Sequence, residues 1–203
     1  MKKKILFTIL TIILVIVVLY IIFFFRNNSI LTSVLNIENE YKNKNNLSVE
    51  AEVYNENNSS GKIIMKLSHK DNLYKLEHYS DDNNLIFLYN AETKQTQSYD
   101  TLTNNMELIE NNNFTVQSPM YTLLSDYDKN ELIRLALTQW ISTEKIDSVS
   151  CYRIQTKNRI IWVDKETKLP KKIKFLQSSN NESIILFSNW SVDNLTDNDM
   201  ELP

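Results

Sequence analysis

The chain has 203 residues, of which 22 are Lys or Arg and 25 are Asp or Glu. The first 26 residues hold four of the basic residues and no acidic one, so residues 27–203 carry a formal charge of −7. Nucleic acids and anionic lipid surfaces are bound by clustered Lys and Arg, which makes this acidic portion a poor partner for either. With 42% hydrophobic residues, the chain can build one globular core.

An apolar stretch without charge begins at Ile5 and ends at Phe25. A helix of this length rises about 30 Å, the thickness of a hydrocarbon core. The alternative is a cleaved signal peptide, whose apolar part is usually about 7–15 residues long and ends at small residues. This stretch is longer and ends in three Phe residues and Arg26. We therefore expect a cytoplasmic tip and transmembrane anchor over residues 1–26, and one domain over residues 27–203.

The positively charged residues predict the orientation of this anchor. Lys2, Lys3 and Lys4 precede the apolar stretch, and such residues stay on the cytoplasmic side. We expect a single-pass protein of the cell membrane with a cytoplasmic N-terminus and an extracytoplasmic C-terminal domain. The single cysteine, Cys151, fits this location, because a lone thiol forms no intrachain disulfide. Its alternating sequence context predicts a buried structural thiol.

After a polar joint at residues 27–29, apolar residues recur every three or four positions from Ile30 to Tyr41, which predicts a helix. Alternation of apolar and polar residues then predicts strands. The predicted strands cover residues 47–53, 63–67, 74–79, 85–89, 149–156, 159–164, 171–177 and 183–192. A further polar, edge-like strand is expected after the fourth of these and runs through Tyr99. Polar turns are expected at 55–60, 91–94, 165–170 and 178–182.

In the middle of the chain, the spacing of the apolar residues changes from the period of two of a strand to the period of a helix. Ser125 is a suitable N-cap, and Ile133, Leu137, Trp140 and Ile141 lie on one face of a helix that is expected to reach about residue 144. The predicted fold class is α+β: an N-terminal transmembrane helix, then a curved antiparallel sheet or half-barrel. An early helix and the mid-chain helix would close this half-barrel.

The segment from Ile160 to Ile173 reads IIWVDKETKLPKKI. It resembles a hairpin of the periplasmic lipoprotein-carrier (LolA-like) superfamily, in which a strand ending in Asp precedes a Thr-Gly-Leu-Pro-like turn. Lys168 stands where that family usually has Gly. The last four residues, Met200 to Pro203, resemble the family's closing segment. The resemblance extends to membrane-attached relatives of Gram-positive and spore-forming bacteria, and it implies a lipid-handling half-barrel. A tethered chain, however, is unsuited to the family's shuttle role.

No catalytic pattern is recognisable in the sequence. His69 and His78 lie on different predicted strands and have no ligand at metal-binding spacing. The serines lack the flanking glycines of a nucleophile elbow, and Gly61 is the only glycine, so no phosphate-binding loop is expected. We expect no enzyme, no metal and no cofactor.

The apolar side of the sheet is the remaining candidate site. We expect it to hold a lipid, an acyl chain or another apolar ligand beneath the mid-chain helix, with Trp140 buried in that helix as part of a lid. The candidate ligand-binding residues are Met65, Leu67, Tyr74, Leu76, Phe87, Ile133, Leu137, Trp140, Trp162 and Phe175, with Leu85 and Ile173 beside them. A filled core would give the same periodicity. The alternative function is a non-enzymatic protein-interaction or regulatory module of the envelope, such as a partner of a cell-wall amidase in sporulation or germination.

Overall fold

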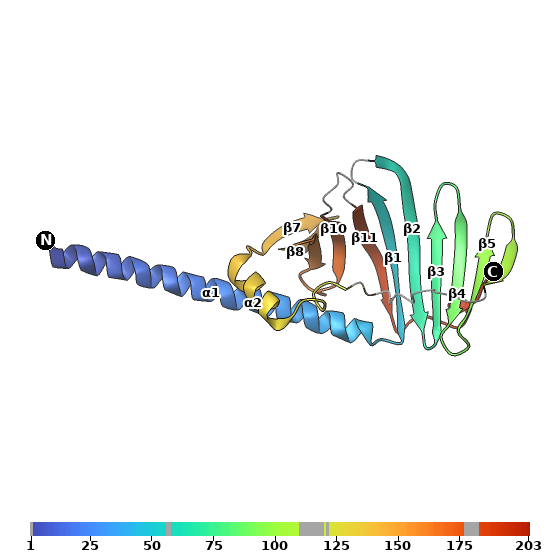
Figure 1. Cartoon of the computed structure of the whole chain (residues 1–203), viewed down its shortest axis with the longest axis horizontal. Helices are drawn as coiled ribbons and strands as arrows, with labels where there is room; N and C mark the ends of the chain where they lie inside the picture. Colours follow the sequence, from blue (N-terminus) through green and yellow to red (C-terminus); the bar gives the residue numbers. More distant parts are fainter. Residues whose placement is uncertain (1, 56–57, 110–119, 121, 177–182) are drawn as a thin grey trace.

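The computed structural model describes residues 2–55, 58–109, 120, 122–176 and 183–203. It has a long N-terminal helix, an 11-stranded sheet and a second helix between the sixth and seventh strands (Figure 1). This confirms the predicted α+β class with a mid-chain helix. The turn expected at residues 178–182 lies outside the described residues, and the turn at 55–60 does so in part.

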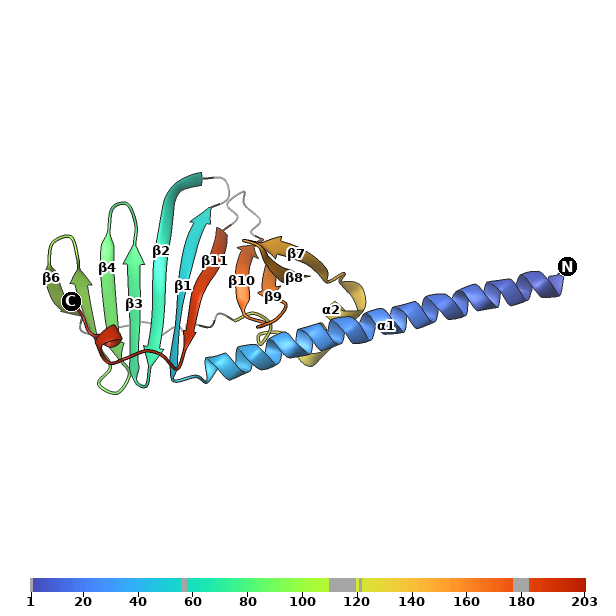
Figure 2. The same ribbon diagram turned by 180° about the vertical axis from the view of Figure 1, so that it is seen from behind.

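Helix α1 runs without a break over Lys2–Lys42. At 1.5 Å per residue it is about 60 Å long. Its N-terminal half projects away from the domain, and its large apolar side chains are exposed there (Figures 1 and 2). The polar joint expected at residues 27–29 is therefore wrong. Asn27 is fully buried, and its side-chain amide donates to the carbonyl oxygens of Ala136 and Gln139 at 3.1 and 2.8 Å. The polar residue binds the second helix and does not interrupt the first.

All neighbouring strands pair antiparallel, in the order β6-β5-β4-β3-β2-β1-β11-β10-β9-β8-β7. Strand β1 pairs with β11, the last strand of the chain, so two meanders join at the centre of the sheet. The strands are β1 Asn46–Asn55, β2 Asn58–Lys70, β3 Leu73–Tyr79, β4 Asn84–Asn90, β5 Gln95–Asp100, β6 Asn105–Ile109, β7 Ser142–Ile146, β8 Val149–Gln155, β9 Arg159–Asp164, β10 Pro170–Phe175 and β11 Ser183–Val192.

The inner face of the sheet is the face that packs against α1, and the opposite face is called the outer face. On β1 the inner face carries Leu47, Val49 and Ala51, all buried, as the period of two predicts. Leu31 and Val34 of α1 belong to the same core. Over β1, β11, β10, β9 and β8 the core is closely filled. Its further buried members are Ile30, Leu67, Met120, Leu123, Leu124, Leu135, Ala136, Ile141, Ile154, Ile161, Val163, Ile173, Ile185 and Phe187.

Helix α2 spans Lys129–Thr138, a shorter span than expected. Its N-cap is Asp128, which forms a capping box with Glu131. Ser125 does not cap the helix, because its hydroxyl donates to the carboxylate of Glu38 on α1 at 2.5 Å. At the other end, β7 begins at Ser142, and the expected helix to about residue 144 is wrong.

The C-terminal segment crosses the outer face of β1 to β3 (Figure 2). Met200, in a short 3-10 turn over Asn198–Met200, is 2% exposed. Asn46 exchanges two hydrogen bonds with the backbone of Leu195. Lys75 of β3 donates to the carbonyl oxygens of Asp199 and Glu201. Part of the outer face of β1 to β3 is thereby covered by this short segment.

Candidate ligand-binding site

The inner face continues beyond the filled core as rows of apolar side chains on β2, β3 and β4. Leu67, Leu76 and Phe87 lie directly opposite one another on these strands. Leu67 is buried, whereas Leu76 and Phe87 are only half-buried. Met65 and Leu85 flank them, on either side of His78. The apolar surface thus extends two strands past the residues that α1 covers.

A third row contains aromatic rings. Tyr74 stacks on His69 with 4.0 Å between ring centroids, and Tyr89 lies on its other side at 6.2 Å. The ring of His69 is held by a 2.8 Å hydrogen bond between Nε2 and the carbonyl oxygen of Asp71. Burial and the neighbouring Tyr89 raise the pKa of Tyr74, so its hydroxyl stays neutral. This row forms the polar margin of the apolar surface.

On the β3 to β5 part of this face, two buried polar atoms have no hydrogen-bond partner in the described part of the chain. They are Nδ1 of His78, between Met65 and Leu85, and Oγ1 of Thr96, opposite Tyr89. An unsatisfied buried donor or acceptor costs about 1–3 kcal/mol. A water or a polar group of a ligand would remove this cost.

Residues 122–127, called the plug segment, fill the inner face on the other side of α1. Leu123 and Leu124 are fully buried. Arg159 of β9 donates to the carbonyl oxygen of Thr122 at 2.8 Å and forms an ion pair with Asp126. The segment is therefore anchored both by an apolar core and by a buried cation.

From the helix side, Glu38 holds the plug segment. Its carboxylate accepts hydrogen bonds from the backbone amides of Leu124 and Ser125 at 2.7 and 3.1 Å and pairs with Lys42 at 2.8 Å. Burial raises the pKa of the Glu38 carboxyl. The hydrogen bonds from Lys42, Ser125 and two backbone amides outweigh burial and bring the pKa below its ordinary value. Glu38 is therefore charged, and its role is structural.

A separate groove of about 380 Å³ lies between α1 and α2. It is mainly apolar, with Lys129 at its margin. Its lining residues are Phe24, Asn28, Leu31, Thr32, Leu35, Lys129, Leu132 and Ile133.

Most of the predicted site residues share the inner face. Met65, Leu67, Tyr74, Leu76 and Phe87 form the rows described above, and Phe175 packs at the edge of the core. The helical candidates are distributed differently. Ile133 lines the groove, and the carbonyl oxygen of Leu137 accepts a hydrogen bond from the Tyr20 hydroxyl at 3.1 Å.

Trp140 contradicts the expected lid. It is 71% exposed, so the prediction of a buried tryptophan on the sheet is wrong. Helix α2 ends at Thr138, and the extended backbone that follows turns Trp140 toward α1. There its ring stacks on Phe23, with 5.6 Å between centroids, and lies 5.9 Å from the guanidinium of Arg26.

Trp162 lies on the outer face, away from the other candidates. Its neighbour Ile161 faces the core, and alternation along β9 turns Trp162 to the opposite side. It packs with Cys151 and Ile160 and donates to the carboxylate of Glu144 at 2.7 Å. The residues of β9 are buried on both faces, and the strand is a nearly continuous apolar run in the sequence. The sequence therefore did not indicate which face Trp162 lies on.

Cys151 is buried, as expected. Burial and the nearby carboxylate of Asp164 raise the pKa of its thiol. Within the described residues, no group of three or more His, Cys, Asp or Glu side chains is placed to hold a metal ion.

Several site residues were missed by the sequence analysis. Phe24, Leu31 and Leu35 of the groove belong to a stripe that runs through the anchor and into the domain. Their spacing of seven and four residues was available in the sequence. The polar joint expected at residues 27–29 divided the helix into two predicted parts, so the spacing across the joint was not recognised. His78 and Thr96 carry no pattern that marks them, since their orphan atoms depend on three-dimensional packing.

No known family profile matches the sequence, and no curated protein is similar to it in sequence. Among solved structures, an uncharacterized conserved protein from Thermus thermophilus has a TM-score of 0.50 at 9% identity, and the match covers 85% of this chain and 93% of that one. A LolA superfamily protein from Nitrosomonas europaea has a TM-score of 0.37 at 11% identity, covering 84% and 97%. A putative outer membrane lipoprotein-sorting protein domain from Vibrio parahaemolyticus has 0.33 at 13%, covering 83% and 94%. At these identities the likeness to solved structures is one of fold.

Proposed function

We propose that this chain is a membrane-anchored extracytoplasmic domain that binds a lipid acyl chain or a similar apolar ligand. The ligand would lie on the inner face over β2 to β4, beside α1. The observation that supports this proposal is the half-buried row of Leu76 and Phe87, which continues from the buried core. Apolar surface of this kind gains about 25 cal/mol for each Å² that a ligand covers.

Two further features support the same site. The orphan atoms of His78 and Thr96 would bind a ligand's carbonyl or hydroxyl oxygen. The anchor would hold the domain at the surface of a bilayer, which is a source of acyl chains, with β2 to β4 on the side of the domain away from the free half of α1 (Figure 1). Lys2, Lys3 and Lys4 favour a cytoplasmic N-terminus, so the site would lie on the outer side of the membrane.

Photolabelling tests this proposal. The full chain in nanodiscs is irradiated with a diazirine-bearing fatty acid, and the labelled peptides are mapped. We expect label on the β3 and β4 peptides that excess unlabelled fatty acid removes. The variant Leu76→Gln should lose this label, whereas Ile64→Gln, an exposed outer-face control on β2, should keep it. Label confined to residues 5–25 would overturn the proposal.

A second candidate function, a protein-interaction module, is favoured by β6. This strand ends the described sheet, and Met106 and Leu108 on it are more than half exposed. An exposed edge strand can pair with a strand of another chain. Cross-linking and co-purification of the full chain from its membrane tests this function. A stoichiometric partner that is lost in Leu108→Lys would support it, and recovery of lipid alone would count against it.

A further inference from the structure

The C-terminal end of α2 touches the part of α1 that lies inside the apolar stretch. The Tyr20 hydroxyl donates to the carbonyl oxygen of Leu137 at 3.1 Å, and Phe23 stacks on Trp140. Arg26, the first charged residue after the stretch, donates to the carbonyl oxygen of Ile141 at 3.0 Å. Together with the two bonds from Asn27, these contacts satisfy carbonyl groups at the end of α2. The end of α2 is therefore fixed to α1 at a defined level.

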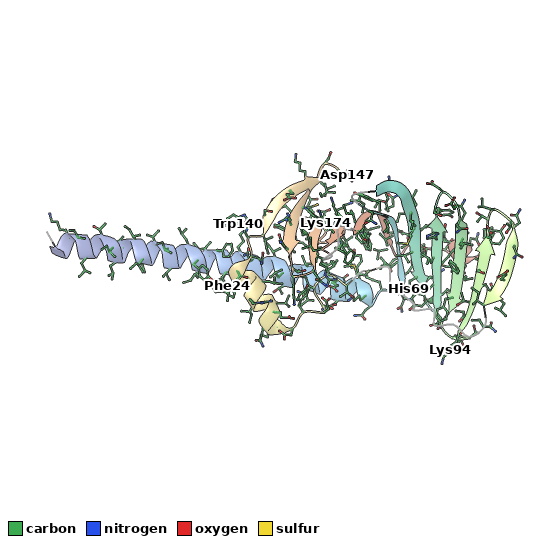
Figure 3. All side chains as sticks on the ribbon, turned by 45° about the horizontal axis from the view of Figure 1, so that its top comes forward. Phe24, His69, Lys94, Trp140, Asp147 and Lys174 are labelled. Atoms are coloured by element: carbon green, nitrogen blue, oxygen red, sulfur yellow. The ribbon has the colours of Figure 1, made fainter. Side chains whose placement is uncertain are left out.

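That level corresponds to the surface of a bilayer. If residues 5–25 span the hydrocarbon core, Phe23 lies about 3 Å and Tyr20 about 8 Å inside its outer boundary, at 1.5 Å per residue. The headgroup layer adds roughly 5–8 Å outside that boundary. A ring that stacks on Phe23 must then lie at the border between headgroups and acyl chains. In Figures 1 and 3, α2 and Trp140 lie on the side of the domain nearest the free half of α1.

The chemistry of this surface matches that border. Trp140 exposes 71% of its surface, whereas Trp162 is buried and Trp190 half-buried. Trp and Tyr are enriched at membrane interfaces, where the ring packs among lipids and its polar atom stays hydrated. Arg134 is exposed on α2 about one turn before Leu137, and a long basic side chain can reach phosphate groups from this depth.

We infer that the end of α2, with Trp140 at its centre, inserts into the outer interface of the phospholipid bilayer and holds the domain against it. The occupant of this surface is the lipid interface itself, continuous with the lipid around the anchor. The inference rests on the anchor spanning the membrane, and it requires no ligand on the inner face of the sheet.

Depth-dependent fluorescence quenching tests the inference. The full chain is reconstituted into phosphatidylcholine vesicles that carry bromine atoms near the glycerol end of the acyl chains. Trp140→Phe and Trp190→Phe are compared, so that each variant retains two tryptophans. We expect a bromolipid-quenched emission component in the wild type and in Trp190→Phe, and its loss in Trp140→Phe. Aqueous iodide should quench this component at least several-fold less than it quenches a free tryptophan analogue.

Two results would overturn the inference. If iodide quenches the Trp140 component and bromolipid does not, the surface faces water. If neither quencher reaches Trp140, a second copy of the chain or another protein covers it. Because Trp140 is exposed, Trp140→Phe should leave the melting temperature nearly unchanged, which keeps the comparison valid. The photolabelling of the inner face can fail or succeed regardless of this outcome.

Discussion

Glu38 is the residue that joins α1 to the plug segment. Its buried carboxylate accepts hydrogen bonds from the amides of Leu124 and Ser125, and the amide of Leu124 would otherwise be an unpaired donor in an apolar core. A charged acceptor of this kind contributes about 1.5–3 kcal/mol per hydrogen bond. Glu38 lies in the sequence among polar residues of the helix, Asn36, Asn39 and Glu40, and nothing there distinguishes it.

Glu38→Gln is expected to lower the free energy of unfolding by about 1–3 kcal/mol at neutral pH, because the ion pair with Lys42 and the charged acceptor are lost. The folded-state pKa of Glu38 lies below its ordinary value of 4.5. Its contribution is therefore present above pH 4.5 and is lost as the pH falls through the lowered pKa. Urea denaturation across this range should show a flatter pH dependence in Glu38→Gln. Glu40→Gln, which removes a mostly exposed carboxylate two residues further along α1, is the matched control and should behave as the wild type.

The thiol of Cys151 is expected to be unreactive in the folded protein. Burial and the Asp164 carboxylate raise its pKa, so the reactive thiolate is scarce, and the sulfur is also shielded from reagents. Titration with an aromatic disulfide reagent should proceed at least roughly tenfold more slowly in buffer than in denaturing urea. Equal rates in the two conditions would show that the Cys151 thiol is accessible to reagents in the folded protein, which contradicts this prediction.

At the scale of elements, turns show how a chain with one glycine forms tight connections. Within the described ranges, eight residues other than glycine adopt a positive φ, among them Lys94 between β4 and β5 and Lys168 between β9 and β10. Lys168 occupies the position where the resemblance to the LolA-like hairpin places Gly, and its φ of 61° is the conformation that glycine accepts without cost. With Lys at this position, the turn keeps its conformation but the backbone is strained.

Lys94→Gly is expected to raise the free energy of unfolding by about 0.5–1 kcal/mol. A left-handed conformation costs a non-glycine residue about 1–2 kcal/mol, and the added freedom of the unfolded chain offsets part of the gain. Lys94 is exposed at the tip of its turn (Figure 3). Gln97→Gly, at an exposed extended position of β5, should lower stability by a similar amount. Denaturation midpoints of the two variants should therefore move in opposite directions.

Strands could be predicted from the sequence wherever one face is apolar and the other polar. Strands β1, β3 and β11 follow this alternation, and their positions were predicted within a few residues. Strands β6 and β7 were missed because most of their residues are exposed on both faces, so pairing alone defines them. The position of Trp140 could not be predicted either. It depends on α2 ending at Thr138, where carbonyls are satisfied by side chains of α1 more than 100 residues away.

At the scale of the whole molecule, the anchor predicts a definite protease pattern. If residues 5–25 span the membrane with the N-terminus in the cytoplasm, protease added to intact, wall-stripped cells should remove the domain and leave a small membrane-bound fragment. Detection uses one tag at the N-terminus and one at the C-terminus. A mature N-terminus near Asn27 or Ser33 would instead show that a signal peptidase removes the apolar stretch.

The continuity of α1 has a consequence for how the domain meets other molecules. Seventeen residues of α1 follow Phe25, so if residues 5–25 span the membrane, the helix rises at most about 25 Å above the hydrocarbon boundary before the sheet begins. Because no flexible linker intervenes, the domain would then revolve about the membrane normal and drift within the plane, with little freedom to swing outward. Its encounters with other membrane-bound molecules would be set by their number per unit area of membrane, which dilution of the surrounding fluid leaves unchanged.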